Sequence, residues 1–250
     1  MTTIVLLQKE LAEHLKTYKL LIVMGVLLAF GLATPLLLVY MPQILSMSGE
    51  NVPIELPQFT TTDAVKSYLD SMGQIGLLAI ILISMGAIAQ EREHGTAALV
   101  LSKPVGIASF VLAKLLGLAA VMAAGLAASA LGFYAYTTVL LGSPDPAIFA
   151  GAMLLVGVYL LFVISVTLLF SALLRNQVLV AVTALATVIG VGFLGTLSVL
   201  EPYLPGSLMH WAYALVAGQD QTRWPALAVS LVLVVACVLG AWRGLRHQEL

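Results

Sequence analysis

Long apolar runs alternate with short polar connections along most of the chain. Six of these runs are long enough to cross about 30 Å of hydrocarbon as helices, and backbone exposed to lipid must be helical or closed into a barrel. The pattern therefore predicts an all-α, polytopic membrane protein with one transmembrane domain over residues 1–250. The six predicted spans lie at about 20–40, 72–89, 107–138, 148–173, 178–199 and 224–242.

Residues 3–18 carry a different pattern, in which apolar residues recur at helical spacing on one face and charged residues occupy the other. This pattern is typical of an amphipathic helix that lies in the membrane surface, here directly before the first span. The alternative interpretation is a helix that packs on a soluble partner. The apolar face consists of Ile4, Leu7, Leu11, Leu15 and Tyr18.

Two connections on the presumed outer side differ in character. Residues 41–71 are expected to form a solvated loop that contains a short helix over 62–69. Residues 200–223 are more apolar but are interrupted by Pro202 and Pro205, which makes one straight helix unfavourable. Two short re-entrant helices that enter the outer leaflet and return would fit this segment before the sixth span.

Composition agrees with a lipid environment, because 61% of the residues are hydrophobic, 9% are charged and the mean hydropathy is +1.06. A soluble domain carries about 25% charged residues. No basic stripe with interleaved aromatic residues suggests nucleic-acid binding. The distribution of Lys and Arg predicts that both termini are cytoplasmic. We expect the protein in the inner (plasma) membrane. Nine basic residues then lie inside (Lys9, Lys16, Lys19, Arg92, Lys103, Lys114, Arg175, Arg243, Arg246), against Lys66 and Arg223 outside.

The sequence lacks the residues that most membrane enzymes and carriers need. No Asp, Glu or Arg falls in the middle of a predicted span, and Lys114 lies near the start of the third. A proton- or ion-coupled carrier usually keeps a charge at mid-depth, so this class is disfavoured. There is no GxxxxGK[ST] loop, HExxH or GxSxG motif, and the single cysteine, Cys237, cannot form an intrachain disulfide. We therefore expect no catalytic, cofactor-binding or metal-binding residues in this chain.

A charged island, EREHGTAALVLSKPV, occupies residues 91–105 between the second and third spans. Its charges mark the exit from the membrane, and Gly95 and Thr96 can end one helix and cap the next. The apolar stretch that follows is too short to cross lipid. The pattern predicts a small cytoplasmic helix with exposed apolar side chains, which implies a partner with a groove. The alternative is that the charges only cap helix ends and stay solvated.

The order Glu-Arg-Glu-x-Gly-Thr, apolar residues, Leu-Ser-x-Pro-Val and then a long span resembles the permease subunits of ATP-binding-cassette exporters of the ABC-2 type. The resemblance covers the whole chain, from the amphipathic start to the broken segment before the last span. It implies that residues 91–106 form the coupling helix and that residues 3–18 form the connecting helix. The residues that it places at the ATPase contact are Glu91, Arg92, Glu93, Gly95, Thr96, Leu101, Ser102 and Pro104.

The resemblance also implies partners. Two permeases pair, and each rests on a separate ATPase subunit, so that two ATPase subunits bind ATP and Mg²⁺ and this chain holds neither. The translocation path would lie between the permeases, bordered by the second and fifth spans. We expect export of a hydrophobic or amphipathic compound. The alternative is a non-exporting membrane subunit that anchors soluble enzymes, or that couples cytoplasmic ATPase work to a periplasmic maturation or assembly partner.

Overall fold

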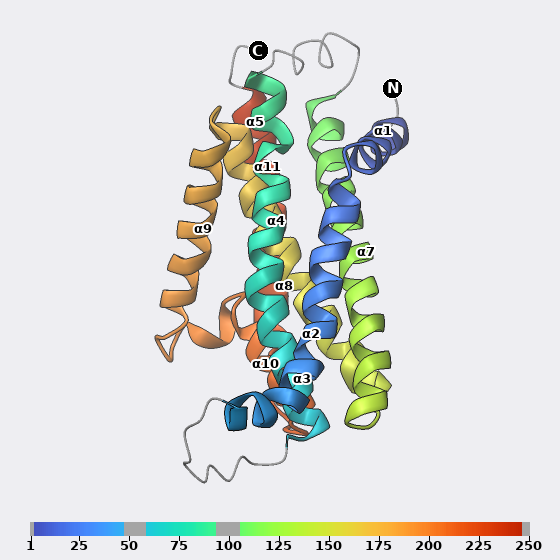
Figure 1. The fold of residues 1–250 in the computed structure, drawn as a ribbon. Helices are drawn as coiled ribbons and strands as arrows, with labels where there is room; N and C mark the ends of the chain where they lie inside the picture. Colours follow the sequence, from blue (N-terminus) through green and yellow to red (C-terminus); the bar gives the residue numbers. More distant parts are fainter. Residues whose placement is uncertain (1–2, 48–58, 94–105, 247–250) are drawn as a thin grey trace.

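The computed structural model describes residues 3–47, 59–93 and 106–246, and all regular elements in these ranges are helices. Figure 1 shows long helices side by side in one bundle, with α1 and the last turn of α11 at the same end. The elements are α1 (Thr3–Lys16), α2 (Lys19–Met47), α3 (Thr61–Ser71), the π-helical turn η1 (Met72–Gly76), α4 (Leu77–Ser84), α5 (Gly86–Glu93), α7 (Ile107–Leu140), α8 (Pro146–Leu173), α9 (Gln177–Leu194), the 3₁₀ turn η2 (Glu201–Tyr203), α10 (Ser207–Val216) and α11 (Trp224–Arg246).

Six helical segments of the described residues are long and apolar enough to cross a membrane, which confirms the predicted all-α fold with six spans. Most of them begin and end within a few residues of the predicted limits. The fifth is shorter than predicted, because α9 ends at Leu194 and the chain then enters turns. The six segments are Lys19–Met41, Thr61–Glu93, Ile107–Leu140, Pro146–Leu173, Gln177–Leu194 and Trp224–Arg246.

The second span differs most from its predicted range, since its helix begins at Thr61 and not near residue 72. Thr60 caps the helix in a reciprocal pair, in which the backbone N–H of Asp63 donates to Thr60 Oγ1 and the N–H of Thr60 donates to Asp63 Oδ2. Val65 and Tyr68 on the inner face of α3 are buried. Hydropathy placed the start of the span near residue 72, where the side of the helix that faces away from the bundle becomes apolar. The helix itself begins eleven residues earlier. The short helix expected in the loop is therefore the first part of this span.

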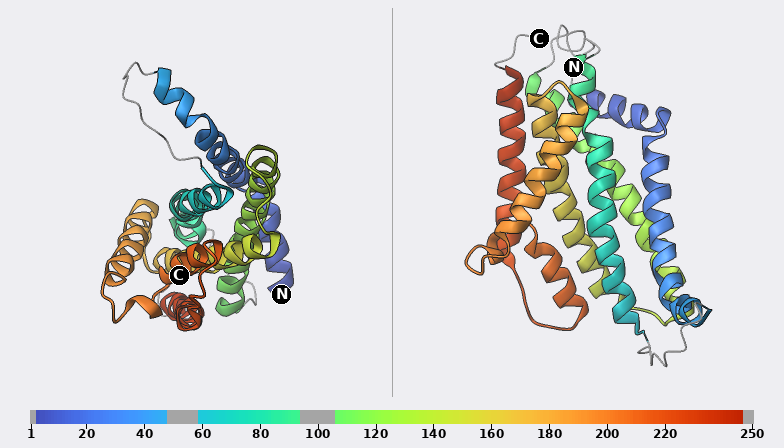
Figure 2. Two further views of the ribbon diagram at one scale, coloured as in Figure 1. Left: turned by 90° about the horizontal axis from the view of Figure 1, so that it is seen from below. Right: turned by 60° about the vertical axis from the view of Figure 1, so that its left-hand side comes forward.

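The core lies around α8, which is apolar on all sides and packs against α4, α7, α9, α10 and α11. Viewed from below in Figure 2, α8 is surrounded by these helices, whereas α9 stands at the edge of the bundle. About 56% of the most apolar part of α8 is buried, compared with 17% for α9. The edge position leaves one long face of α9 for lipid or for another protein.

Aromatic stacking and one buried hydrogen-bond chain join α2, α3, α7 and α8. The rings of Tyr68 and Phe133 stack with centroids 4.2 Å apart, and Phe149 lies 5.6 Å from Phe133. The Tyr68 hydroxyl donates to Ser129 Oγ at 3.0 Å, and Ser129 donates to the carbonyl of Leu27 at 2.7 Å. These contacts satisfy the buried hydroxyl groups and fix the α2–α7 distance.

Small residues allow the helices to approach closely within the chain. A β-carbon at Gly132 would lie 2.5 Å from a methyl carbon of Leu28, and one at Gly244 would lie 2.7 Å from a methyl carbon of Leu173. Gly132 therefore belongs to the α2–α7 interface and Gly244 to the α8–α11 interface. Close packing at small residues is the usual way in which helices associate in lipid, where there is no hydrophobic drive between them.

The segment between α9 and α11 contains the turn η2 and the helix α10, where two short helices were predicted. Figure 2 shows that α10 continues beyond the end of α9, and that the chain returns from it to the start of α11. Leu208 and Ala212 of α10 are fully buried, and the helix packs against α8 and α3. Glu201 of η2 forms an ion pair with Arg223, which closes the segment at its base. Its depth in the membrane stays a prediction.

Candidate functional site: a buried ion-pair cluster

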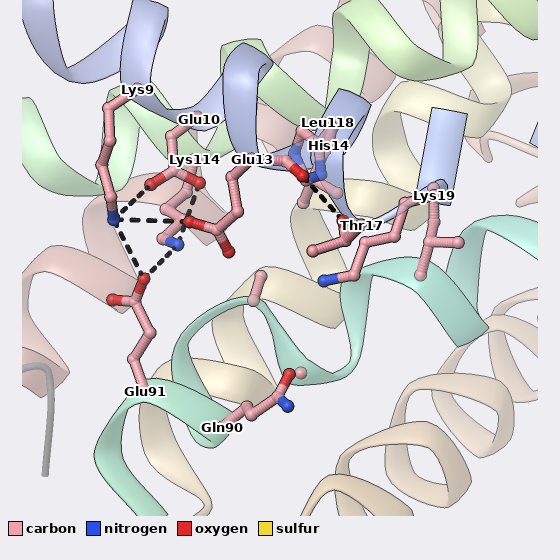
Figure 3. A pocket seen from close by; sticks show the side chains of 13 residues that line it. Lys9, Glu10, Glu13, His14, Thr17, Lys19, Gln90, Glu91, Lys114 and Leu118 are labelled. Carbon is pink, nitrogen blue, oxygen red and sulfur yellow. Dashed lines mark hydrogen bonds and ion pairs between the residues drawn. The ribbon is translucent and has the colours of Figure 1, made fainter. Parts of the chain in front are cut away.

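Five charged side chains meet at the end of the bundle that carries α1. They come from three elements that are distant in sequence, and Figure 3 shows them turned toward one another. A cavity of about 380 Å³ lies beside them, between α1, α5 and α7. We call this group the charged cluster, and it consists of Lys9, Glu10 and Glu13 from α1, Glu91 from α5 and Lys114 from α7.

Lys114 is the centre of the charged cluster. Its side chain is 4% exposed, and its ammonium lies 2.7 Å from Glu91 Oε1 and 2.9 Å from Glu10 Oε2. Glu10 is buried to the same degree. Because an unpaired charge buried at this depth would be strongly unfavourable, each of these groups depends on the other two. One ammonium thus connects α1 to the last turn of α5.

Lys9 forms the outer, half-exposed edge of the cluster. Its ammonium lies within 3.5 Å of carboxylate oxygens of Glu91, Glu10 and Glu13. Burial opposes the charged form of Lys9, but the fields of the three carboxylates outweigh it and raise the pKa of the ammonium. For Glu13, burial acts against ionisation, but Lys114, Lys9 and nearby Lys19 together lower the pKa of its carboxyl group. Lys9 and Glu13 are therefore charged at neutral pH.

The three carboxylates are also close enough together to ligate one metal ion, since Glu10, Glu13 and Glu91 each place an oxygen within 4.8 Å of the others. Two of these groups already share Lys114, which competes for the same oxygen lone pairs. Because the ammonium of Lys114 takes the place that a metal ion would occupy, the three carboxylates belong to an ion-pair network. The arrangement therefore favours a structural or mechanical role over cation binding.

His14 lies next to the cluster, one helical turn after Glu10, at the interface between α1 and α7. Its side chain is buried, and neither ring nitrogen has a hydrogen-bond partner among the described residues. Burial and the nearby cations Lys19 and Lys114 lower the pKa of its imidazole to about 4. Gly117 of α7 permits this contact, since a β-carbon there would lie 3.5 Å from His14 Nε2 and 3.1 Å from the β-carbon of Glu10. His14 is thus neutral, and its contact with α7 is one of packing.

A second set of contacts holds α5 against α8. The Ser171 hydroxyl accepts from the backbone N–H groups of Ile88 and Ala89, both at 3.0 Å, and donates to the carbonyl of Met85 at 2.9 Å. The side chain is inserted where the helix is interrupted between α4 and α5. Arg92 Nη1 donates to the carbonyl of Ala172 at 2.8 Å. The last two turns of the second span are consequently fixed to α8 on one side and to α1 and α7 on the other.

The structure describes three of the eight residues that the family resemblance places at the ATPase contact. Glu91 and Arg92 make the intramolecular contacts given above, and Glu93 is exposed at the end of α5. The other five lie outside the described residues, namely Gly95, Thr96, Leu101, Ser102 and Pro104. The assignment of all eight to a contact with an ATPase stays a prediction.

Sequence reasoning missed Glu10 and Glu13, because they belong to the charged face of the predicted helix 3–18, which was expected to face away from the membrane. It missed His14 because this residue was assigned to neither face. In the structure, Ile4 and Tyr18 of the apolar face are more than 60% exposed, whereas Glu10 of the polar face and the neighbouring His14 are buried. The signal that could have found the site is Lys114, an isolated ammonium near the start of a long apolar run that requires acidic partners.

The fold and this site show that the chain is a multi-pass membrane protein, and that its most buried charges connect its helices to one another. Comparison with known proteins gives the family. The model of the ABC-2 family transporter proteins matches residues 4–247, so the chain belongs to this family. It is also similar to the uncharacterized transmembrane protein YxlG of Bacillus subtilis (strain 168), with 26% identity over 98% of this chain and 97% of the relative.

Family membership confirms the resemblance seen in the sequence. The members are membrane components of transporters and are typically not catalytic themselves, and membership implies association with ATP-binding-cassette ATPases. By its family, the chain is thus a membrane component of a transporter.

Proposed function

We propose that this chain is the permease subunit of an ATP-driven exporter, and that it forms the translocation path together with a second permease copy or a close relative. Two separate ATPase subunits would bind ATP and Mg²⁺ at the cytoplasmic side of the inner membrane, where both termini of this chain would lie. They would act on the segment 91–106, and the cargo would be a hydrophobic or amphipathic compound.

The observation that carries this proposal is the bridge made by Lys114. Segment 91–106 connects α5 to α7, so any force applied to it reaches the two helices through Glu91 and through the first turns of α7. Lys114 joins these two flanks to each other at 2.7 Å and to Glu10 of α1 at 2.9 Å. The three elements can therefore move as one body, which is what a lever between an ATPase and the membrane requires.

Ser171 and Arg92 attach this lever to a helix of the core. They hold α5 to the C-terminal turns of α8, which lies in the core. Rotation of the α1–α5–α7 body about these contacts would change the angle at the interruption between α4 and α5, and it would tilt the first and second spans. A path bordered by spans two and five, between two permeases, would open to one side as this angle changes. No chemical step in this chain is needed.

The experiment is reconstitution of the chain in lipid with the ATPases encoded beside it. The variants are Glu91→Gln, which removes one charge from the bridge, and Gly95→Pro, which alters the segment itself. Lys16→Met is a matched control, because Lys16 is an exposed cation on α1. We expect the two variants to keep the protein in the membrane but to lose most of the permease-dependent ATPase activity, with the control unchanged.

Unaltered complex formation and ATP hydrolysis after both changes would reject the coupling assignment. Transport of a reporter amphiphile into or out of sealed vesicles then separates export from a non-exporting role. ATPase activity that depends on the permease but never moves an amphiphile would support the assembly or maturation alternative. No ATPase bound under any condition would reject both.

A further inference from the structure

A second cavity lies in the opposite half of the bundle from the charged cluster. It is a groove of about 440 Å³ between the second span, α8, α9 and α10. Its walls are mostly apolar and include Leu78 and Ile189, which are exposed. Figure 1 places these elements around the lower end of α9, the helix with the least buried surface. The groove is thus open toward the side of the bundle where the proposed function expects the path.

One end of the groove is polar. Asp70 is exposed there, and the Tyr213 hydroxyl of α10 donates to its Oδ1 at 2.5 Å. Gln74 lies one turn after Asp70 and is also exposed. Tyr159 of α8 lines the same groove. A carboxylate, an amide and two tyrosines therefore line an otherwise apolar groove.

The backbone is specialised at this point. The π-helical turn η1 begins two residues after Asp70 and contains Gly73, where a β-carbon would lie 2.9 Å from the terminal methyl group of Met209 in α10. A single π-turn inside a longer helix is uncommon and occurs frequently at functional sites. Here it accompanies the close approach of α10, which brings Tyr213 to the carboxylate.

The charge of the groove is negative, because Asp70 has no ion pair with any cation in the described part of the chain. Twenty helical residues separate Asp70 from Gln90, which corresponds to about 30 Å, the thickness of the hydrocarbon layer. The carboxylate is therefore at the level of the opposite interface. A carboxylate beside tyrosine rings is suited to an organic cation, since both attract positive charge.

We propose that this groove binds the cationic head of an amphipathic compound, with the apolar body of the compound along α4 and α9. The inference rests on the proposed export function, to which it adds a substrate class, namely a lipophilic ammonium or a similar cation. Asp70 supplies the charge, the tyrosines supply polarisable faces, and the apolar walls accept the rest of the molecule.

The test compares tetraphenylphosphonium with tetraphenylborate, which have similar apolar bodies and opposite charges. Binding to the full chain in nanodiscs of zwitterionic lipid is measured by equilibrium dialysis, with empty nanodiscs subtracted. We expect saturable binding of the cation, and a loss of about tenfold in affinity for Asp70→Asn. Asp220→Asn, which alters an exposed carboxylate of the 217–223 connection, should have no effect.

Tyr213→Phe distinguishes a ligand-binding carboxylate from one that only holds α10. This variant removes the hydrogen bond but keeps the charge, whereas Asp70→Asn removes the charge and keeps an acceptor. We expect Tyr213→Phe to retain cation affinity within about threefold. Equal binding of the anion by the wild type, an unaffected Asp70→Asn, or a larger loss with Tyr213→Phe would each overturn the proposal.

The binding measurement needs no ATPase, so it is independent of the test of the proposed function. If ATPases fail to associate, cation binding can still be observed or refuted. If ATPases associate and transport proceeds while Asp70→Asn moves the cation as fast as the wild type, the substrate assignment fails and the export function stands.

Discussion

Replacing Lys114 by methionine tests the charged cluster most directly. The substitution keeps the length of the side chain and removes the ammonium that lies 2.7 Å from Glu91 and 2.9 Å from Glu10. Both carboxylates are then left largely buried without their closest cation. Removal of one partner from a buried ion pair costs about 3–5 kcal/mol. Lys9 remains within 3.5 Å of both carboxylates, so we expect the lower limit, about 3 kcal/mol.

The assay is unfolding of the purified chain in mixed micelles at pH 7.5, followed by far-ultraviolet circular dichroism. Lys16→Met is the matched control, because it removes an exposed cation from the same end of the bundle. Such a surface change should alter the free energy of unfolding by less than about 0.5 kcal/mol. If Lys114→Met and Lys16→Met were equally stable, the cluster would not hold the three helices together.

A triple variant separates the loss of a partner from the loss of the network. Glu10→Gln and Glu91→Gln, added to Lys114→Met, remove the two uncompensated carboxylates together with the ammonium. Replacement of a whole buried ionic group by neutral residues is often close to neutral in stability. We therefore expect the triple variant to recover at least half of the loss. A triple variant that is less stable than Lys114→Met would contradict the account of uncompensated charge.

Three further predictions concern single groups. Ser171→Ala leaves two backbone N–H groups of α5 without their acceptor and should cost about 1–3 kcal/mol, whereas Ser165→Ala on the same helix, whose hydroxyl only bonds its own helix, should be near neutral in the same unfolding assay. His14 has a pKa of about 4 in the fold, so as the pH falls the unfolded chain takes up a proton on this residue before the folded chain does. Stability should therefore fall by about 2–3 kcal/mol as the pH drops from 6.5 to 4, and His14→Leu should flatten this dependence. Tyr68→Phe removes the donor to Ser129 and should cost about 1 kcal/mol, which a Ser129→Ala double-mutant cycle can assign to their hydrogen bond.

The fold could be predicted from the sequence because lipid allows few alternatives. An apolar run of about 20 residues must form a helix and must cross, so the number and order of the spans follow from hydropathy. The start of the second span at Thr61 could not be found from hydropathy, although a short helix over 62–69 was expected in the loop. It is determined by the capping pair of Thr60 and Asp63 and by burial of Tyr68, and these features depend on local geometry and on α7.

The candidate site was harder to predict, since it depends on which face of α1 turns toward the bundle. On a helix, Lys9 and Glu13 are four residues apart, as are Glu10 and His14, a spacing that is also typical of a solvated face. Only the position of α7 shows that Glu10 and His14 are covered. Lys114 lies about a hundred residues away, and no periodicity relates it to α1.

An ion-pair contact between α1, α5 and α7 fixes their relative positions more precisely than an apolar contact would. Apolar contacts between α1, α5 and α7 would tolerate small shifts in register, because dispersion forces have little directionality. The ammonium of Lys114 permits few arrangements, since it must contact Glu10 and Glu91 together or leave a buried charge unpaired. Such a network is stable in discrete positions, which is the property that a two-state lever needs. If the triple variant keeps its stability but loses ATPase coupling, the cluster is present for positional accuracy and not for stability. Retention of both properties would mean that packing around Gly117 alone positions α1.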